Sequence, residues 1–203
     1  MIIKTFTEPP IENNNYLIID EISKEAALVD CSDNILNDIK PVLEEYNAKL
    51  KYILLTHGHF DHITGLDVEH ETEVYMHSGD SEWIERLNEY LPMVGLPPMN
   101  EPEINKYLND KDILMLGENE IKVIHTPGHT QGGVCFLIGE NLFSGDTIFR
   151  ESIGRCDLPG GKFDQILESI KNKILTLSNE TVIYPGHGSK TTVAWEKEHN
   201  SYF

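Results

Sequence analysis

Three histidines and one aspartate lie between Thr56 and His62, where the chain reads Thr-His-Gly-His-Phe-Asp-His. The segment follows directly on the apolar residues 52–55. A hydrophobic core has little use for adjacent imidazoles, because each buried polar group needs its own hydrogen-bond partner. Neutral imidazole and carboxylate are common protein ligands of zinc and of non-haem iron. The segment therefore predicts a metal site rather than a capped loop before a helix.

A second pattern recurs further along the chain, where Pro-Gly-His twice follows an apolar run. The two copies end in His129 and His187, and Asp146 follows the apolar pair Leu142 and Phe143 in a similar way. Glycine allows the backbone to turn sharply at such points. Side chains presented by turns at strand ends can meet at one rim of a sheet sandwich, although they are far apart in sequence. We therefore expect these three side chains to join the histidine-rich segment.

The candidate metal ligands are too numerous for one tetrahedral ion and suit two ions that share a carboxylate. They are His57, His59, Asp61, His62, His129, Asp146 and His187. His57 and His59 are two residues apart, so an extended backbone points both to the same side. We assign His57, His59 and His129 to the first ion. We assign Asp61, His62 and His187 to the second ion, with Asp146 as the bridge.

The other histidines and the cysteines lie outside these motifs. Structural roles are expected for His70, His77, His125 and His199, of which His125 could support a ligand because it precedes His129 by four residues. The cysteines are Cys31, Cys135 and Cys156. Their number is odd and no Cys-x-x-Cys motif is present, which favours reduced thiols and a cytoplasmic protein. Cys156 is expected to be a passive thiol.

The charge balance restricts the partners. The 203 residues include 16 Lys and Arg against 34 Asp and Glu, for a formal net charge of −18. Such a surface repels nucleic-acid phosphates and anionic membranes, so neither nucleic acid nor a membrane is an expected partner. No run approaches the roughly 20 apolar residues of a membrane span, and no signal peptide is visible. The length predicts one domain over residues 1–203.

Short apolar runs bounded by turn residues predict the strands that must position the ligands. These runs are Tyr16–Ile19, Ala26–Val29, Leu50–Leu55, Val74–Met76, Ile113–Leu116, Ile121–Ile124, Val134–Ile138 and Thr181–Tyr184. The early strands could form an antiparallel meander, whereas the later ones alternate with helices. This mixture predicts α+β or α/β layering rather than an all-β barrel.

Apolar residues at helical spacing predict helices over Ile35–Tyr46 and Phe163–Ile174. The first should be capped by Ser32 or Asp33 and be kinked or broken at Pro41. A third helix is expected to begin near Ser78, and a short one spans Val193–Asn200. The proline-rich stretch Leu91–Pro102 predicts a long loop, either an active-site lid or a packed surface connection.

Together these residues resemble the metallo-β-lactamase superfamily, whose signature Thr-His-x-His-x-Asp-His stands at residues 56–62. The later ligands of that family match His129, Asp146 and His187 in order. The resemblance covers nearly the whole chain. It implies an α+β fold, a four-layer αββα sandwich, with a binuclear site at the edge of the two sheets.

Further motifs resemble glyoxalase II and its relatives: residues 125–130 (His-Thr-Pro-Gly-His-Thr), residues 145–149 (Gly-Asp-Thr-Ile-Phe) and the pair Gly154-Arg155. The resemblance implies that Arg155 contacts the glutathione moiety. A salt bridge between Arg155 and Asp157 is the alternative. Glyoxalase II proper carries a helical C-terminal domain that holds glutathione, whereas only residues 188–203 follow His187 here. The chain is therefore most similar to short, single-domain glyoxalase II-like hydrolases.

The expected activity is hydrolysis of a thioester such as S-lactoylglutathione, through hydroxide generated by two divalent ions. Zinc is the expected metal, with iron or manganese as alternatives. Asp61 would anchor the second ion and orient the nucleophile. The rival activity is an iron-dependent persulfide dioxygenase, since residues 61–65 and 152–157 are also similar to those enzymes. Hydrolysis of a lactone or a β-lactam and a binding protein without turnover are weaker alternatives.

Overall fold

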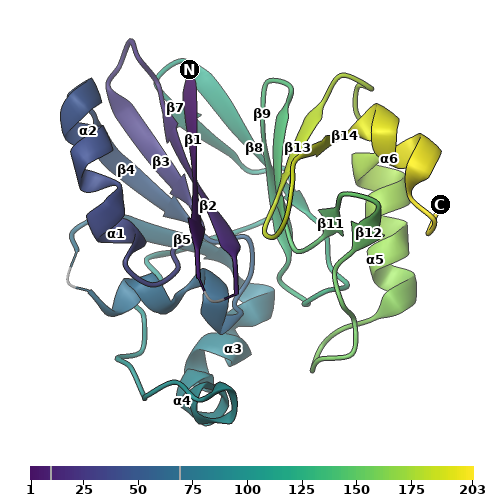
Figure 1. Cartoon of the computed structure of the whole chain (residues 1–203), viewed down its shortest axis with the longest axis horizontal. Coiled ribbons are helices and arrows are strands. Elements are labelled where there is room, and N and C mark those ends of the chain that lie inside the picture. Colours follow the sequence, from purple (N-terminus) through teal and green to yellow (C-terminus); the bar gives the residue numbers. More distant parts are fainter. Residues whose placement is uncertain (10, 69) are drawn as a thin grey trace.

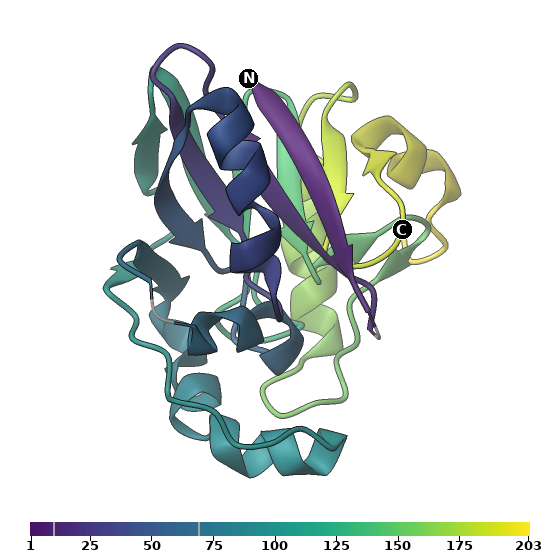
Figure 2. The same ribbon diagram turned by 60° about the vertical axis from the view of Figure 1, so that its left-hand side comes forward.

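Two mixed β-sheets face each other in the computed structural model, which describes residues 1–9, 11–68 and 70–203. Helices α1 (Ile35–Asp38) and α2 (Lys40–Tyr46) lie on the outer face of the first sheet (Figure 1). Helices α5 (Phe163–Ser169) and α6 (Val193–His199) lie on the outer side of the second sheet, as the turned view in Figure 2 also shows. The layers confirm the predicted α+β class and the αββα sandwich.

The first sheet has the strand order β1-β2-β3-β4-β5-β6. Its strands are β1 (Ile2–Glu8), β2 (Asn13–Ile19), β3 (Glu25–Val29), β4 (Lys49–Leu54), β5 (Glu73–His77) and β6 (Lys106–Leu108). The first three strands are antiparallel, as the predicted meander requires, but β3 to β6 run parallel. The meander therefore ends at β3, because the α1–α2 crossover returns the chain in the same direction.

The second sheet has the order β14-β13-β10-β9-β8-β7. Its strands are β7 (Ile113–Leu116), β8 (Asn119–His125), β9 (Val134–Ile138), β10 (Asn141–Gly145), β13 (Val182–Pro185) and β14 (Thr191–Thr192). Strands β10 and β13 are parallel, and the other pairs are antiparallel. A short ribbon of β11 (Ile148–Phe149) and β12 (Ser152–Ile153) follows β10. Buried and exposed residues alternate along β7, as expected for a half-buried strand.

The helix predictions hold with local corrections. Helix α1 ends at Asp38, and Pro41 lies in the first turn of α2, where its missing N–H costs no hydrogen bond. The N-cap of α1 is Asn34 in a left-handed conformation, so the predicted caps are wrong. Helix α5 continues as a π-helical turn over Ile170–Ile174. Phe163 of the predicted apolar stripe is exposed.

The stretch Leu91–Pro102 is not a loop throughout. A 3-10 turn at Ser78–Asp80 leads into α3 (Ser81–Glu85), α4 (Leu87–Tyr90) and a second 3-10 turn at Leu91–Val94. Asn88 then exchanges two hydrogen bonds with the backbone of Met99, and Asp67 accepts two from Asn100. These bonds favour the packed surface connection over a free lid.

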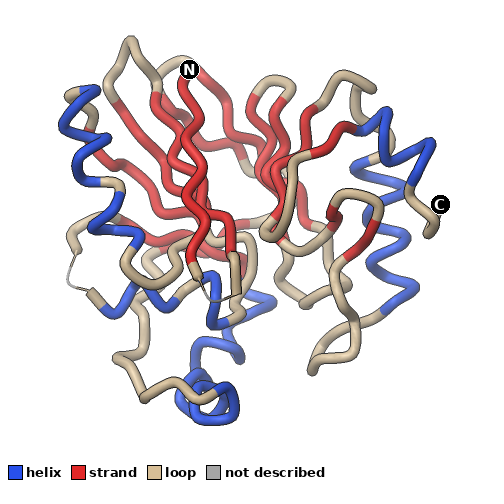
Figure 3. The backbone as a smooth tube through the Cα atoms, in the orientation of Figure 1, coloured by secondary structure: helices blue, strands red, loops and turns tan. Residues whose placement is uncertain are grey.

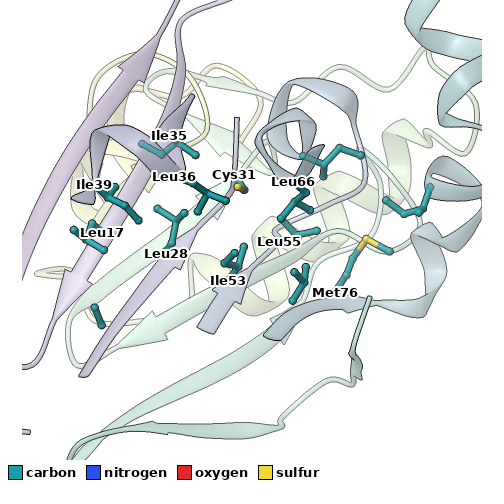
Figure 4. Close-up of a cluster of buried hydrophobic side chains, with 14 of the residues drawn as sticks. Leu17, Leu28, Cys31, Ile35, Leu36, Ile39, Ile53, Leu55, Leu66 and Met76 are labelled. Carbon is teal, nitrogen blue, oxygen red and sulfur yellow. The ribbon is translucent and has the colours of Figure 1, made fainter. Parts of the chain in front are cut away.

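The core lies in three clusters that hold the strand ends in place. Figure 4 shows the one between α1 and the first sheet, with Leu17, Leu28, Ile35 and Ile53 among its side chains. The second cluster fills the space between the sheets, and the third lies under α5. Among the described residues, no helix is long and apolar enough to cross a membrane.

Candidate metal centre

The candidate ligands follow the ends of strands that converge on one edge of the sandwich. Strand β4 leads into the Thr56–His62 segment. Strands β10 and β13 are parallel neighbours, and β8 runs in the direction of β10 because β9 between them is antiparallel to both. His129, Asp146 and His187 therefore emerge at the same edge. Figure 3 shows the loops that gather there, in the lower middle of the view.

The three histidines assigned to the first ion form a compact, buried group, called here the three-histidine group: His57, His59 and His129. Nδ1 of His59 lies 3.1 Å from Nε2 of His57 and 2.9 Å from Nε2 of His129. A tetrahedral zinc ion with bonds of about 2.05 Å separates its ligand atoms by about 3.3 Å. Both distances lie close to the spacing that one ion requires, and the ligand atoms of all three histidines lie within 4.8 Å of one another.

Asp61, His62 and His187 form a second group, called here the Asp61 group. Oδ2 of Asp61 lies 3.3 Å from Nε2 of His187 and 3.7 Å from Nε2 of His62. The side chain of His62 is fully buried, whereas those of Asp61 and His187 are 15% and 25% exposed. The Asp61 group is therefore the side of the centre that a substrate can approach.

Asp146 lies between the two groups. Its Oδ1 is 3.5 Å from Nε2 of His62, and its Oδ2 is 3.6 Å from Nε2 of both His129 and His187. This position suits a carboxylate that bridges two ions. The close approach requires glycine at position 186, since a Cβ there would overlap Oδ1 of Asp146 and the ring of His62. The glycine of the Pro-Gly-His motif therefore has a steric role.

Unpartnered polar atoms show that these residues fit a metal. Native proteins pair almost all buried polar atoms. Here Nε2 of His62 and Oδ1 of Asp146 are buried and lack any hydrogen-bond partner, although they face each other. Nε2 of His59 also has no partner, but Nδ1 is the atom of this ring that faces His57 and His129, so Nε2 lies outside the ligand set and the ring packs edge-on against Trp83. Imidazole nitrogens and carboxylate oxygens are donors that zinc and iron accept, so His/Asp clusters of this kind indicate a dinuclear site.

Asp30 orients His62 of the Asp61 group, and no sequence motif pointed to it. Its Oδ2 accepts a hydrogen bond from Nδ1 of His62 at 2.8 Å, which directs Nε2 of His62 toward the centre. The same carboxylate accepts hydrogen bonds from the backbone N–H and the hydroxyl of Thr56. Asp30 directly follows β3, and its place at a strand end is the signal that could have revealed it.

Asp80 is a second buried carboxylate without an obvious sequence signal. It accepts hydrogen bonds from the backbone N–H groups of Gly58 and Gly132 and from the hydroxyl of Thr130. These bonds tie the Thr56–His62 segment to the loop that carries His129. Burial raises the pKa of Asp80 in spite of the three donors. The residue therefore positions the two ligand-bearing loops relative to each other.

Charge states differ between the two groups. Burial, followed by repulsion from neighbouring histidines, holds the pKa of His57 well below its usual range and lowers the pKa of His59 to about 3. Both imidazoles are therefore neutral at physiological pH and free to donate lone pairs. His62 differs: burial lowers its pKa, but Asp30, Asp61 and Asp146 outweigh burial and raise the pKa to about 10. An ion at Nε2 of His62 would take the place of that proton.

Arg155 reaches the site through its main chain. Its carbonyl oxygen accepts a hydrogen bond from Nδ1 of His129 at 2.7 Å, which leaves Nε2 of His129 facing the centre. Its guanidinium donates two hydrogen bonds to Asp157, at 2.7 and 2.8 Å, and both side chains are largely exposed. The predicted alternative, pairing with Asp157, is thus present. Substrate contact by the side chain stays a prediction.

The remaining histidines and cysteines lie outside the two ligand groups. His125 donates a hydrogen bond to the carbonyl of Gln131 and stacks on His77, with ring centroids 4.0 Å apart. His125 thereby supports the loop that contains His129. Burial raises the pKa of Cys135 to about 11 and also raises the pKa of Cys156. A raised pKa disfavours the thiolate, so neither cysteine is an activated nucleophile.

Comparison with known proteins agrees with this geometry. The family model described as the Metallo-beta-lactamase superfamily matches residues 9–187. The chain is 33% identical to hydroxyacylglutathione hydrolase GloC of Haemophilus influenzae, over 94% of this chain and 92% of that protein. The crystal structure of the BLEG-1 B3 metallo-beta-lactamase superposes with a TM-score of 0.89 at 34% identity and covers 99% of both chains. TTHA1623, crystallised in a di-iron-bound form, superposes with a TM-score of 0.84 at 31% identity, over 98% of this chain and 100% of that one.

Proposed function

Because this chain belongs to the metallo-beta-lactamase superfamily, we propose that it is a binuclear metallohydrolase that cleaves a thioester. The acyl-thiol class is proposed from the likeness to hydroxyacylglutathione hydrolase GloC and from the glyoxalase II-like motifs at residues 125–130 and 145–149. The observation that carries the proposal is the convergence of His57, His59 and His129 beside Asp61, His62 and His187, with Asp146 between them.

The three-histidine group would hold one ion, and the Asp61 group would hold the other, with Asp146 shared. Ions held by these residues would lower the pKa of a bound water molecule and polarise a carbonyl oxygen. Zinc is the first choice for this donor set. Iron is the alternative, because the similar TTHA1623 was crystallised with two irons.

The side chains have separate tasks in this proposal. Asp61 is partly exposed and lies 3.3 Å from His187, so its carboxylate orients the attacking water at the open side of the centre. Nearby His62 and His187 outweigh its burial and lower the pKa of Asp61, which keeps the carboxylate ionised. A thiolate is a good leaving group, so the reaction needs no strong acid. This suits a site in which His57 and His59 are neutral.

The direct test is hydrolysis of S-D-lactoylglutathione by purified protein loaded with zinc or with iron. Turnover should require metal and should fall at least a hundredfold in His59→Ala, with a parallel loss of bound metal. His70→Ala is the matched control, because His70 lies outside both ligand groups. Equal turnover by His59→Ala and the unaltered protein would contradict the proposal.

Two parallel assays separate the rival activities. The likeness to the BLEG-1 B3 metallo-beta-lactamase makes a chromogenic cephalosporin the relevant β-lactam probe. Oxygen uptake with glutathione persulfide tests a mononuclear iron dioxygenase. Faster turnover of the thioester than of the cephalosporin or the persulfide supports the proposal. Oxygen uptake without thioester cleavage would instead identify the protein as a dioxygenase.

A further inference from the structure

A pocket of about 150 Å³ lies beside Asp61, on the open side of the metal centre. Its apolar wall comes from three separate segments: Ile11 after β1, Phe60 in the histidine-rich loop, and Val94 with Leu96 after α4. Ile11, Val94 and Leu96 are each 39–49% exposed, so they are not part of the core. An apolar cavity of about this volume holds a benzene molecule in other proteins. The pocket therefore has room for a compact apolar group.

Asn13 is among the residues that line this pocket, and both polar atoms of its side chain are buried. It is the first of three consecutive buried asparagines at the start of β2. Asn14 donates hydrogen bonds to the carbonyls of Pro185 and Gly188, and Asn15 accepts one from the backbone N–H of Ser32. Neither Nδ2 nor Oδ1 of Asn13 has a partner. Within the described part of the chain, Asn13 is the only residue outside the candidate ligands with such buried atoms.

Asn13 therefore differs from Asn14 and Asn15, whose side chains stabilise the fold through hydrogen bonds. A buried carboxamide without partners destabilises a fold, and an apolar residue of similar shape would not carry that penalty. A ligand that supplies the missing hydrogen-bond partner removes this destabilisation. Asn13 lines the same pocket as Asp61, so the ligand in question is one bound at the metal centre.

The charges around the pocket restrict that ligand further. Glu8, Asp33 and Asp61 line it, and the described lining residues include no lysine or arginine. The protein also has a formal net charge of −18. With Asp61 engaged as a metal ligand, an anionic group deeper in this pocket would still meet the carboxylates of Glu8 and Asp33, with no lysine or arginine among the described lining residues.

We propose that this pocket binds the acyl group of the substrate and selects uncharged acyl chains of about four to six carbons or a phenyl ring. In the bound complex, Asn13 hydrogen-bonds to a polar atom of the acyl group. The inference rests on the proposed thioester hydrolysis and specifies its substrate class. The lactoyl group, with its single methyl, fills only part of the space.

An acyl series on one neutral thiol, N-acetylcysteamine, tests the selectivity with metal-loaded protein. The value of kcat/KM should rise at least tenfold from acetyl to hexanoyl, because each buried methylene contributes about fourfold. The value of kcat/KM for the succinyl ester, which carries a carboxylate, should be at least tenfold lower than that for the butanoyl ester. Leu96→Trp should fill the pocket and lower the hexanoyl-to-acetyl ratio, whereas Ile113→Trp, at an exposed position on β7, should keep the ratio.

The role of Asn13 is tested by stability and activity together. Asn13→Leu should keep or raise Tm while lowering kcat/KM for the hexanoyl ester about tenfold, the effect of one lost hydrogen bond. Asn14→Leu is the matched control and should lower Tm, because it breaks three hydrogen bonds, two donated by Nδ2 and one that Oδ1 accepts from the hydroxyl of Thr7. A fall of Tm in Asn13→Leu as large as in Asn14→Leu, with kcat/KM unchanged, would overturn the assignment.

A non-cleavable ketone, in which CH₂ replaces the thioester sulfur, separates this inference from the proposed function. If thioesters are cleaved without dependence on chain length, the pocket assignment fails and the hydrolase proposal stands. If no thioester is cleaved, calorimetry with the hexanoyl ketone decides. If the unaltered protein binds the ketone and both Leu96→Trp and Asn13→Leu bind it more weakly, the pocket binds the acyl group even though thioester hydrolysis is not the activity. If the unaltered protein and both variants bind it equally, or none of them binds it, the pocket assignment is rejected.

Discussion

The backbone carbonyl of Arg155 lies 2.7 Å from Nδ1 of His129 and accepts its hydrogen bond. The side chain of the same residue points to a different partner, Asp157, through two further hydrogen bonds. Arg155 thus combines a main-chain role at the metal centre with an exposed guanidinium. Substitutions change only the second of these, which makes the two roles separable.

Arg155→Ala should leave bound metal unchanged, because the carbonyl that orients His129 is retained. We expect KM for S-D-lactoylglutathione to rise three- to tenfold, since the guanidinium would no longer attract the carboxylates of glutathione. Steady-state kinetics and elemental analysis measure the two quantities. Asp157→Asn, which releases the guanidinium from its ion pair, should lower KM or leave it unchanged. Loss of metal in Arg155→Ala would show that the side chain, rather than the carbonyl, supports the site.

Metal removal should destabilise the protein. An ion that binds only the folded chain adds about 2.7 kcal/mol of stability at a free concentration one hundred times its Kd. Elemental analysis should find two ions per chain, and chelation should lower Tm measured by calorimetry. His59→Ala should bind less metal and show a smaller chelation effect. A Tm that is insensitive to chelators in the metal-loaded protein would argue against both ion positions.

Asp30→Asn should weaken metal binding at the Asp61 group by about 10- to 100-fold. The carboxamide cannot hold Nδ1 of His62 as the carboxylate does, so Nε2 of His62 is no longer fixed toward the centre. Competition with a chromogenic chelator gives the affinity. Asp38→Asn, at an exposed position on α1, is the control and should bind metal normally. Equal affinities for the two variants would remove Asp30 from the site.

Asp80→Asn should lower the free energy of unfolding by about 1–3 kcal/mol. All three groups that bond Asp80 are donors, so the amide N–H₂ of asparagine would face at least one donor instead of an acceptor. Urea denaturation measures the change, and Asp164→Asn on the exposed face of α5 supplies the control. A loss of metal affinity in Asp80→Asn is also expected, because the two ligand-bearing loops are no longer tied together.

The stacked pair of His77 and His125 should make stability depend on pH. Burial, followed by repulsion from His125, lowers the pKa of His77, with Asp110 acting in the opposite direction. A folded-state pKa below the unfolded value means that stability is present above about pH 6.5 and is lost as the pH falls through the folded pKa. Protonation also removes the hydrogen bond that Nδ1 of His77 accepts from Gly79.

His77→Phe keeps an aromatic ring against His125 and removes the titration. Its free energy of unfolding should therefore fall less between pH 7 and pH 5 than that of the unaltered protein, as urea denaturation of metal-free samples can show. His70→Asn should retain the original pH dependence. Identical pH profiles for His77→Phe and the unaltered protein would assign the pH dependence to other groups.

Local patterns in the sequence restricted the fold to α+β or α/β layering, the motif resemblance added the αββα sandwich, and the residue types supplied the candidate ligands. Ligand chemistry depends on residue type, and the spacing of His57, His59 and Asp61 after an apolar run is visible without a structure. Apolar periodicity likewise located most strands of the two sheets. It did not reveal that β4 runs parallel to β3, because strand direction depends on the path of the connecting helices.

Only the tertiary structure decided which polar groups support the ligands. Asp30 and His62 are 32 residues apart in sequence, and Asn14 reaches carbonyls more than 170 residues away. The main-chain bond from His129 to Arg155 leaves no trace in residue type. The missing partners of Asn13 are equally invisible in the sequence, because they follow from what surrounds the side chain after folding. Residue types therefore determined the chemistry available to this protein, and long-range packing determined how each group is oriented, because burial removes the water that would otherwise satisfy it.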